Sequence, residues 1–325
     1  MNDTAPQQRA IAVDVGGTKL AGALVDARGG CTAARRTPTP GAGGEPGGAD
    51  PGLVGTEAMV RSLHDAAAGG PEPVGVGIGL PEYVTPEGEV RSHEVIGWDE
   101  QPRERFSALG LPVTIESDVR AAALAESLLG SGVGHRVVVY VSVGTGISHC
   151  LVEDGQAYMG ASGAAIAMGE VEVSTPDGAW ALEGYASGAG LARRYSQRIQ
   201  QPVPGAIDVV RAADDGDATA AQMLHRSGTA LGDAIRSVVH LLDPAVVVLG
   251  GGLALGGGRY LDACVRRLER PVARATGGAP VPVHLAALGA EAGVVGAGLA
   301  ALRAVGVAVS MPVRATRTPV TSIPR

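Results

Sequence analysis

A short apolar stretch near the beginning of the chain limits most strongly what the rest can become. Residues 11–15 (IAVDV) are apolar except for Asp14, and they lead into Gly16-Gly17-Thr18-Lys19 and a second apolar stretch. The pattern predicts a strand, a tight turn and a returning strand, because glycine adopts turn conformations that a side chain would block. An ordinary hairpin is one interpretation. The other is a phosphate site, since glycine N–H groups approach an anion closely and a carboxylate in a strand needs a partner such as a hydrated cation.

Two further glycine turns follow apolar runs much later in the chain. Residues 136–143 end in Gly144-Thr145-Gly146, and residues 244–249 end in Gly250-Gly251-Gly252-Leu253. Apolar residues at helical spacing occur between such runs, for example over 218–241, so strands and helices alternate. This alternation predicts an α/β protein. The first strand is not followed by GxGxxG, and GxxxxGK[ST] is absent, which argues against a dinucleotide fold and a P-loop.

Composition and charge exclude several other classes of protein. The 325 residues suffice for two domains or one large one, and 45% of them are hydrophobic. A formal net charge of −7 argues against a nucleic-acid partner. Cys31, Cys150 and Cys264 lie far apart without metal-type spacing, which predicts reduced thiols in a cytoplasmic protein. No apolar signal region and no stretch long enough to span a membrane is found, so no membrane partner is expected.

One further acidic residue stands where a strand meets a helix. Residues 113–118 (VTIESD) predict a strand that runs into an Ala-rich helix over 119–129, and Asp118 lies at the junction. A carboxylate in this position often caps the helix, and the position alone favours capping. A catalytic role is the alternative, and the motifs elsewhere in the chain decide between the two.

In combination these motifs resemble the actin/hexokinase/Hsp70 superfamily and, within it, the ROK family of bacterial sugar kinases and repressors. Residues 14–19 resemble the first phosphate motif, residues 144–146 the second, and residues 249–252 the adenosine motif. Further ROK-like segments occur in the same order along the chain, at 77–81 (GIGLP), 116–126, 160–165, 182–188 and 288–293. The resemblance covers about residues 10 to 305.

The resemblance implies a two-domain, actin-like (ribonuclease H-like) α/β fold with a cleft for ATP and sugar between the domains. The expected domains are 1–118, completed by a C-terminal helix over about 291–305, and 119–290. Residues 306–325 are expected to form a disordered tail. Only ten residues precede the strand 11–15 that leads into the first phosphate motif, so we expect no DNA-binding domain like that of the repressors. A kinase is therefore the implied function, and a homodimer is the implied assembly.

The resemblance also assigns roles to individual residues. Asp118 matches the catalytic base, which accepts the proton of the sugar's primary hydroxyl as that oxygen attacks the γ-phosphorus of ATP. Mg²⁺ would bridge phosphate oxygens, with Asp14 holding it through water. The implied nucleotide contacts are Asp14, Gly16, Gly17, Thr18, Lys19, Gly144, Thr145, Gly146, Gly250, Gly251, Gly252 and Leu253. The implied acceptor contacts are Pro81, Glu82, His93, Glu94, Ser117, Asp118, Glu170 and Glu183.

The chain departs from the family pattern on the acceptor side. Ser117 stands where ROK sugar kinases have Asn, Ala167 stands where they have Glu, and Glu170 stands where they have His. The later Glu is retained as Glu183. Residues 170–183 also lack the Cys and His ligands of the family's zinc site, so we expect no zinc, and we expect Trp180 and Ala181 to fill the volume instead.

Two explanations compete for these departures, an inactive homologue and a change of substrate. Intact ATP-side motifs and Asp118 favour a change of substrate. Glu170 with Glu183 suits a cationic amino group, as in an amino sugar such as kanosamine, and loss of the polar anchors also suits a C7-cyclitol, as in antibiotic biosynthesis. An ordinary glucokinase and a non-catalytic sugar-binding regulator remain as alternatives. The acceptor, the preferred phosphate donor, the oligomeric state and the pathway stay open.

Overall fold

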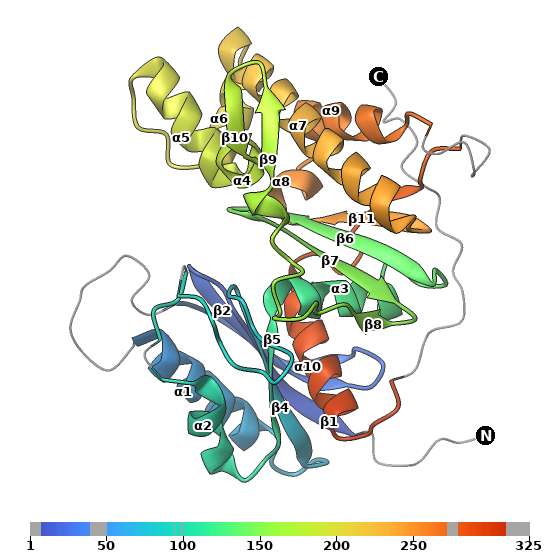
Figure 1. Ribbon diagram of the computed structural model, residues 1–325. Helices are drawn as coiled ribbons and strands as arrows, with labels where there is room; N and C mark the ends of the chain where they lie inside the picture. Colours follow the sequence, from blue (N-terminus) through green and yellow to red (C-terminus); the bar gives the residue numbers. More distant parts are fainter. Residues whose placement is uncertain (1–7, 40–50, 94, 99, 272–278, 310–325) are drawn as a thin grey trace. The chain divides into compact units, whose positions relative to one another are not determined.

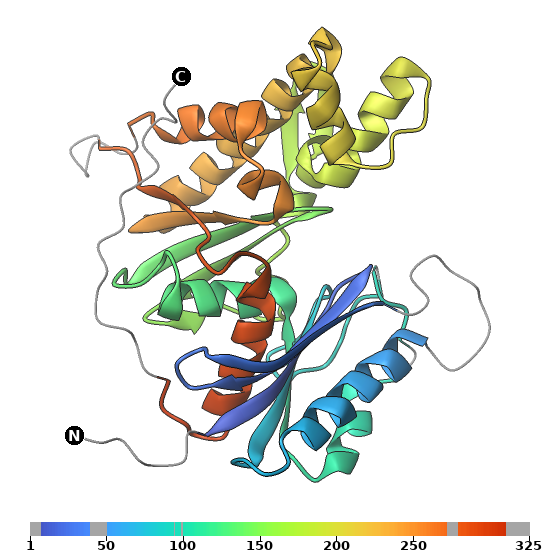
Figure 2. The ribbon, with the colours of Figure 1, turned by 180° about the vertical axis from the view of Figure 1, so that it is seen from behind.

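The structure is a computed structural model that describes residues 8–39, 51–93, 95–98, 100–271 and 279–309. It divides into two compact units (Figures 1 and 2). The first unit contains the described residues of 1–133, 155–166 and 290–314, and the second contains those of 134–154 and 167–289. Strands and helices alternate in both units, so the α/β class expected from the sequence is confirmed.

The first unit is built on a five-stranded sheet with the order β3-β2-β1-β4-β5. The strands are β1 (Arg9–Val15), β2 (Lys19–Asp26), β3 (Cys31–Pro38), β4 (Pro73–Leu80) and β5 (Val113–Ser117). β1 to β3 are antiparallel, whereas β4 and β5 run parallel to β1. This register places Asp14 of β1 between Ala21 and Gly79. The carboxyl ends of β1, β4 and β5 meet at one edge of the sheet, as parallel strands require.

Helices cover the two faces of this sheet according to the alternation of side chains along β1. Ile11, Val13 and Val15 form one core cluster with α1 (Pro51–Ala66), and Ala12 lies in a second cluster with α10 (Ala292–Ala304). Figure 2 shows α1 in blue and α10 in red on opposite sides of the sheet. Three other helical elements belong to this unit: α2 (Pro102–Phe106), η1 (Ser107–Leu109) and α3 (Asp118–Leu129).

Small residues let α10 approach its neighbours closely. Gly296 lies against the backbone carbonyl of Ala121 on α3, and a Cβ at that position would overlap it. This contact places α3 in the first unit, whereas the sequence led us to expect a domain boundary at residue 118. The expected tail over 306–325 lies outside the described residues from position 310 onward.

The second sheet has the order β12-β11-β6-β7-β8. Its strands are β6 (Val137–Val143), β7 (Ile147–Glu153), β8 (Gln156–Ala157), β11 (Val246–Gly250) and β12 (Val283–Leu285), of which β8 belongs to the residues assigned to the first unit. The other elements of the second unit are η2 (Met168–Glu170), the hairpin β9 (Glu172–Thr175) and β10 (Gly178–Ala181), α4 (Leu182–Ala186), α5 (Gly188–Ile199), α6 (Ala206–Asp214), α7 (Ala218–Leu242), α8 (Gly252–Leu255) and α9 (Gly258–Leu268).

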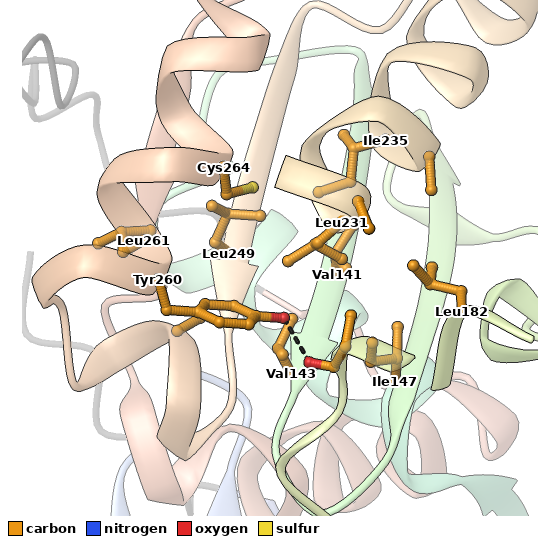
Figure 3. Close-up of a cluster of buried hydrophobic side chains, with 14 of the residues drawn as sticks. Val141, Val143, Ile147, Leu182, Leu231, Ile235, Leu249, Tyr260, Leu261 and Cys264 are labelled. Atoms are coloured by element: carbon orange, nitrogen blue, oxygen red, sulfur yellow. Dashed lines mark hydrogen bonds between the residues drawn. The ribbon is translucent and has the colours of Figure 1, made fainter. Parts of the chain in front are cut away.

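An aliphatic core joins this sheet to α7 and α9 (Figure 3). Val141 and Leu249 of adjacent strands pack with Leu231 and Ile235 of α7. Tyr260 is fully buried, and its hydroxyl donates a hydrogen bond of 2.6 Å to the carbonyl oxygen of Ala186, which satisfies the polar end of the ring.

One sequence-based expectation needs correction in this unit. Helical spacing over 182–195 predicts one helix, but the backbone of Ser187 is extended (ψ 166°) and separates α4 from α5. The Ser187 hydroxyl accepts the N–H of Gly190 and so caps the second helix. Among the described residues, no helix is both long enough and apolar enough to cross a lipid bilayer.

Candidate active site

The first glycine turn joins β1 to β2 and is fixed by its own hydrogen bonds. The N–H of Gly16 donates to the carbonyl of Lys19 at 2.9 Å. Thr39 holds the turn from the other side, because its hydroxyl donates to Gly16 O at 2.6 Å and its N–H donates to Thr18 O at 3.0 Å. Thr18 and Lys19 are exposed. The Gly16 N–H is thus committed to the turn, which leaves Gly17 and Thr18 as the candidate phosphate donors.

Asp14 is a half-buried carboxylate that precedes this turn by two residues. A Cβ on Gly293, at the start of α10, would lie 2.5 Å from Asp14 Oδ2, so the helix reaches the carboxylate only because that residue is glycine. Burial raises the pKa of Asp14 to about 6, and the Lys19 ammonium group opposes the shift. A carboxylate held in this way gains stability from a bound cation.

Asp118 is the first residue of α3, and Ser117 is the N-cap. The Oδ1 atom of Asp118 accepts a hydrogen bond from the N–H of Val119 at 2.6 Å. Burial, followed by the charge of Asp14, raises the pKa of Asp118 to about 7, while the Val119 N–H opposes the shift. Gly79 lies between the two acids: a Cβ there would be 3.5 Å from Asp14 Oδ1 and 3.7 Å from Asp118 Cα. The structure therefore brings Asp14 and Asp118 together, and Asp118 can change protonation near neutral pH.

The expected acceptor contacts of the first unit have different surroundings. Ser117 is buried, and its hydroxyl has no hydrogen-bond partner within the described part of the chain. Glu82 is also buried, with both carboxylate oxygens engaged by a neighbouring loop. Pro81 is half-buried and His93 is exposed. Glu94 lies outside the described residues.

Arg120 is a buried charge that the sequence analysis missed. Its side chain is fully buried, and its guanidinium group donates to the carboxylate of Glu116, to Val84 O at 2.6 Å and to Gly163 O at 2.9 Å. These bonds tie two loops to the corner that carries Asp118. The sequence feature that could have indicated this role is the position of Arg120 in an otherwise Ala- and Leu-rich helix, four residues after Glu116.

The second and third glycine turns meet within the second unit. A Cβ on Gly144 would lie 4.0 Å from the N atom of Gly252. The start of α5 is bonded to the second turn, because the N–H groups of Gly188 and Ala189 donate to Gly144 O and Thr145 O. Thr145 and Gly252 are exposed, and Gly146 and Leu253 are half-buried.

The third turn depends on glycine at two positions. Gly251 has a left-handed backbone (φ 83°), and a Cβ there would overlap the backbone of Val143. A Cβ on Gly250 would overlap the hydroxyl end of Tyr140. The turn is therefore shaped by close packing on β6.

Glu183 contacts the second turn, whereas Glu170 stands at the surface. Glu183 Oε2 accepts the N–H of Ile147 at 2.8 Å, and a Cβ on Gly146 would lie 2.5 Å from the same oxygen. Gly169 packs on the Glu183 side chain, which brings η2 against α4. Glu170 is the last residue of η2 and is exposed.

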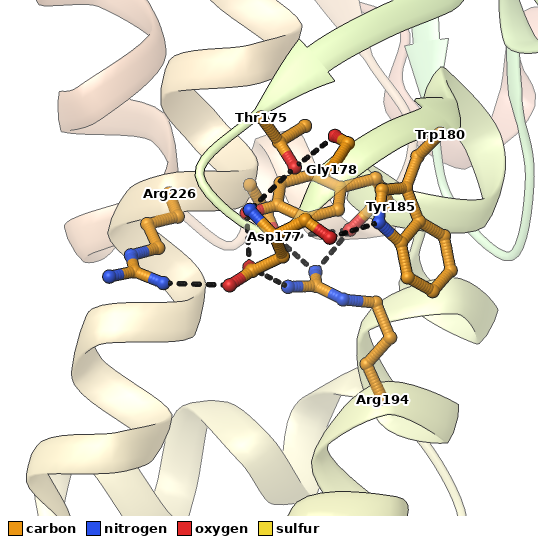
Figure 4. A network of polar contacts seen from close by, with 8 residues as sticks. Thr175, Asp177, Gly178, Trp180, Tyr185, Arg194 and Arg226 are labelled. Carbon is orange, nitrogen blue, oxygen red and sulfur yellow. Dashed lines mark hydrogen bonds and ion pairs between the residues drawn. The ribbon is translucent and has the colours of Figure 1, made fainter.

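A polar network braces the hairpin β9–β10 (Figure 4). Asp177 accepts the hydroxyl of Tyr185 at 2.9 Å and pairs with Arg194 at 3.3 Å and with Arg226 at 3.0 Å. The Arg194 guanidinium group lies 3.6 Å from the Tyr185 ring centroid and 5.7 Å from that of Trp180.

Charged side chains thus surround the segment 170–183, where we expected Trp180 and Ala181 to fill the volume of the family's zinc site. Trp180 is half-buried and Ala181 is exposed, so the expectation that these two would fill a volume together is wrong for Ala181. Among the described residues, no group of three or more His, Cys, Asp or Glu side chains is placed to hold a metal ion. The absence of zinc stays a prediction.

Comparison with known proteins agrees with this geometry. The family model described as "ROK family" matches residues 10–304. A glucokinase of Streptomyces coelicolor is 31% identical over 319 residues, covering 88% of this chain and 95% of that protein. The crystal structure of a ROK hexokinase from Thermus thermophilus superimposes with a TM-score of 0.73 at 30% identity, over 92% of this chain and 99% of that one.

A further structure, a ROK family glucokinase from Streptomyces griseus in complex with glucose and AMPPNP, has a TM-score of 0.73 at 27% identity. The match covers 91% of this chain and 99% of that one. The actin-like kinase fold and the resemblance inferred from the sequence are confirmed by these matches. The chain belongs to the ROK family.

Proposed function

We propose that this chain is an ATP-dependent kinase that phosphorylates the primary hydroxyl of a sugar or sugar-like acceptor. The observation that carries the proposal is the pair Asp14 and Asp118, which lie on either side of Gly79 next to the first glycine turn. The names of the relatives, glucokinase and hexokinase, support sugar phosphorylation, and the complex of one of them with glucose and AMPPNP supports ATP as the donor.

In this proposal Asp118 is the general base. Its carboxylate accepts the proton of the acceptor hydroxyl while that oxygen forms a bond to the γ-phosphorus and the bond from phosphorus to the ADP oxygen breaks. A pKa of about 7 leaves a substantial fraction of Asp118 ionised at neutral pH, yet keeps the carboxylate basic enough to take the proton.

The glycine turns would hold the nucleotide. Gly17, Thr18 and Lys19 offer N–H, hydroxyl and ammonium donors at the first turn, and residues 144–146 offer the second set. Residues 250–253 would accommodate the nucleoside. The half-buried Asp14 fits a role in holding hydrated magnesium. When bound, magnesium would neutralise charge on the phosphates.

We propose a non-standard acceptor, an amino sugar such as kanosamine or a C7-cyclitol. Glu170 and Glu183 are exposed carboxylates of the second unit and suit a cationic amino group. The Ser117 hydroxyl, which has no hydrogen-bond partner among the described residues, lies beside the base in sequence and offers a smaller polar group than the family's Asn. Ordinary glucose is the competing acceptor, since the relatives compared above include glucokinases.

Turnover with a panel of acceptors tests the proposal. ATP would be offered with glucose, kanosamine, glucosamine, N-acetylmannosamine and a valiolone-type cyclitol, and ADP release measured. We expect phosphorylation of at least one acceptor and its loss in Asp118→Ala. Wild-type rates in that variant would remove Asp118 from the mechanism. If no acceptor is phosphorylated but one raises the melting temperature, the chain is a sugar-binding regulator.

The proposal includes the setting in which the enzyme works. We place it in the cytoplasm because its three cysteines predict reduced thiols, and as a homodimer on the basis of the family resemblance. An amino-sugar or cyclitol acceptor would place it in specialised metabolism such as antibiotic biosynthesis. Size-exclusion chromatography with light scattering measures the assembly directly.

A further inference from the structure

Glu82 is a buried acid that the phosphoryl-transfer chemistry does not use. It follows Pro81 at the end of β4, and only 3% of its surface is exposed. A buried carboxylate is costly unless it is well hydrogen-bonded. Oε1 accepts the N–H of Val95 and the N–H of Ile96, each at 2.7 Å, and Oε2 accepts the hydroxyl of Ser92.

All three donors come from the described residues of one loop, 92–96, ten to fourteen positions after Glu82 in the chain. Ser92 is engaged twice, because its hydroxyl also accepts the N–H of Tyr83 at 2.8 Å. The carboxylate therefore holds this loop at the end of β4 through two backbone N–H groups and one hydroxyl group. Hydrogen bonds to a charged acceptor are the stronger kind, so the loop's position depends on this single side chain.

The same loop touches the first glycine turn. A Cβ on Gly17 would lie 2.8 Å from Cγ1 of Val95, so the backbone of the turn closely approaches this side chain. Val95 is itself 53% exposed, so it is the contact with the turn and the bond to Glu82 that fix its place. Glu82 thus links the loop that bears His93 to the turn that follows Asp14.

Glu82 also lies within electrostatic reach of the base. Burial and the charge of Asp14 raise the pKa of Asp118, and the charge of Glu82 adds to the same shift. The charge of Glu82 thus acts on the base, while its oxygens accept hydrogen bonds from the loop.

We infer that Glu82 is a positioning residue, which holds the described residues of loop 92–96 against the first glycine turn so that they form one wall of the acceptor site. The inference rests on the proposed function. It assigns Glu82 an indirect role in place of the direct acceptor contact expected from the sequence.

Three variants separate the indirect role from a direct one. Glu82→Ala removes both acceptor oxygens from the loop. Glu82→Gln keeps one oxygen for the N–H groups of Val95 and Ile96 and loses the charge. Glu89→Gln is the matched control, because that side chain is 55% exposed and bonds only its neighbour Arg91 among the contacts described.

Amide hydrogen exchange of the ligand-free protein tests the loop directly. In Glu82→Ala the amides of Val95 and Ile96 should exchange at least about tenfold faster than in the wild type, since loss of a charge-assisted bond of this kind costs roughly one factor of ten or more. Glu82→Gln should rescue most of the protection, and Glu89→Gln should match the wild type. Unchanged exchange in Glu82→Ala would overturn the inference whatever the activity.

Steady-state kinetics test the link to the acceptor. In Glu82→Ala the KM for the acceptor should rise about tenfold while the KM for ATP changes less, and Glu82→Gln should restore the acceptor KM to within about threefold. An acceptor KM that is unchanged in Glu82→Ala overturns the inference. A loss in Glu82→Gln confined to amino-sugar acceptors also overturns it, because that pattern means direct contact with a cationic group. Failure of the wild-type chain to phosphorylate any acceptor would instead overturn the proposed function.

Discussion

Replacing Asp118 by asparagine should destroy catalysis and at the same time stabilise the protein at alkaline pH. Asparagine has nearly the shape of the protonated carboxyl group, and its oxygen can still accept the Val119 N–H. It cannot act as a base, so turnover should fall by about 100- to 10,000-fold. It also carries no charge into a site where burial raises the pKa of the native side chain to about 7.

The size of the stability change follows from that pKa. In the unfolded chain the carboxyl group loses its proton near 3.8, and in the folded chain near 7, so the folded state binds more protons between these values. The Asp118 carboxyl group therefore makes its full contribution to the free energy of unfolding below about pH 4, and this contribution is lost as the pH rises to about 7. A shift of about three units corresponds to about 4 kcal/mol. Because Asp118 retains some contact with solvent, we expect Asp118→Asn to raise the free energy of unfolding at alkaline pH by only about 2 kcal/mol.

Urea denaturation at several pH values measures this difference. Trp98 is buried in the same unit as Asp118 and provides the fluorescence signal. The gain of Asp118→Asn over the wild type should be near zero at about pH 4, grow through about pH 6 and reach its full value near pH 8. Asp65→Asn is the control, since that side chain is 86% exposed. A gain that is the same at acid and alkaline pH would refute the burial argument, and retained turnover would refute the assignment of the base.

Ionisation of Asp118 should also shape the pH profile: the rate at low acceptor concentration should rise as pH increases through about 7, and a flat profile would contradict the role. Gly251→Ala should raise the KM for ATP about tenfold, because its left-handed backbone and the facing strand β6 exclude a Cβ, whereas Gly205→Ala meets open space and should match the wild type in the same assay. Gly296→Ala should cost about 3 kcal/mol or more in urea denaturation of the first unit, because the new methyl group overlaps the backbone of α3; a loss below about 1 kcal/mol would refute that packing. Metal analysis of protein purified without chelators should find far less than one zinc atom per chain, because residues 170–183 offer no Cys or His; one zinc per chain would overturn the prediction.

The sequence was most informative where periodicity and local chemistry agree. The long amphipathic pattern over 218–241 predicted α7 nearly to the residue, and the apolar run before Gly250 predicted β11. Shorter signals were ambiguous. Ser187 breaks the helical pattern at 182–195 through a backbone angle that the side-chain spacing does not reveal. The small residues around 144–148 suggest a loop, but β7 already begins at Ile147, because its pairing with β6 outweighs local preference.

For the candidate site, motif resemblance indicated which residues to expect there but gave few of their contacts. Asp14 and Asp118 are more than a hundred positions apart, and their proximity rests on the parallel register of β1, β4 and β5. Buried polar contacts were harder still. The hydrogen bonds of Glu82 and Arg120 to loops and the ion pairs of Asp177 with two arginines follow no fixed spacing in the sequence. Each of these contacts joins segments that only the tertiary fold brings together.

The position of α10 has a consequence for how the protein is made. This helix covers one face of the first sheet, and its Gly293 lies against Asp14, although nearly three hundred residues separate the two along the chain. Contacts between such distant residues form slowly because a long loop must close first. On the ribosome, β1 and β2 emerge early but keep one face uncovered until the helix arrives. β1 therefore acquires its finished surroundings long after it is synthesised, and we expect phosphate to bind at this turn only in chains that extend through α10.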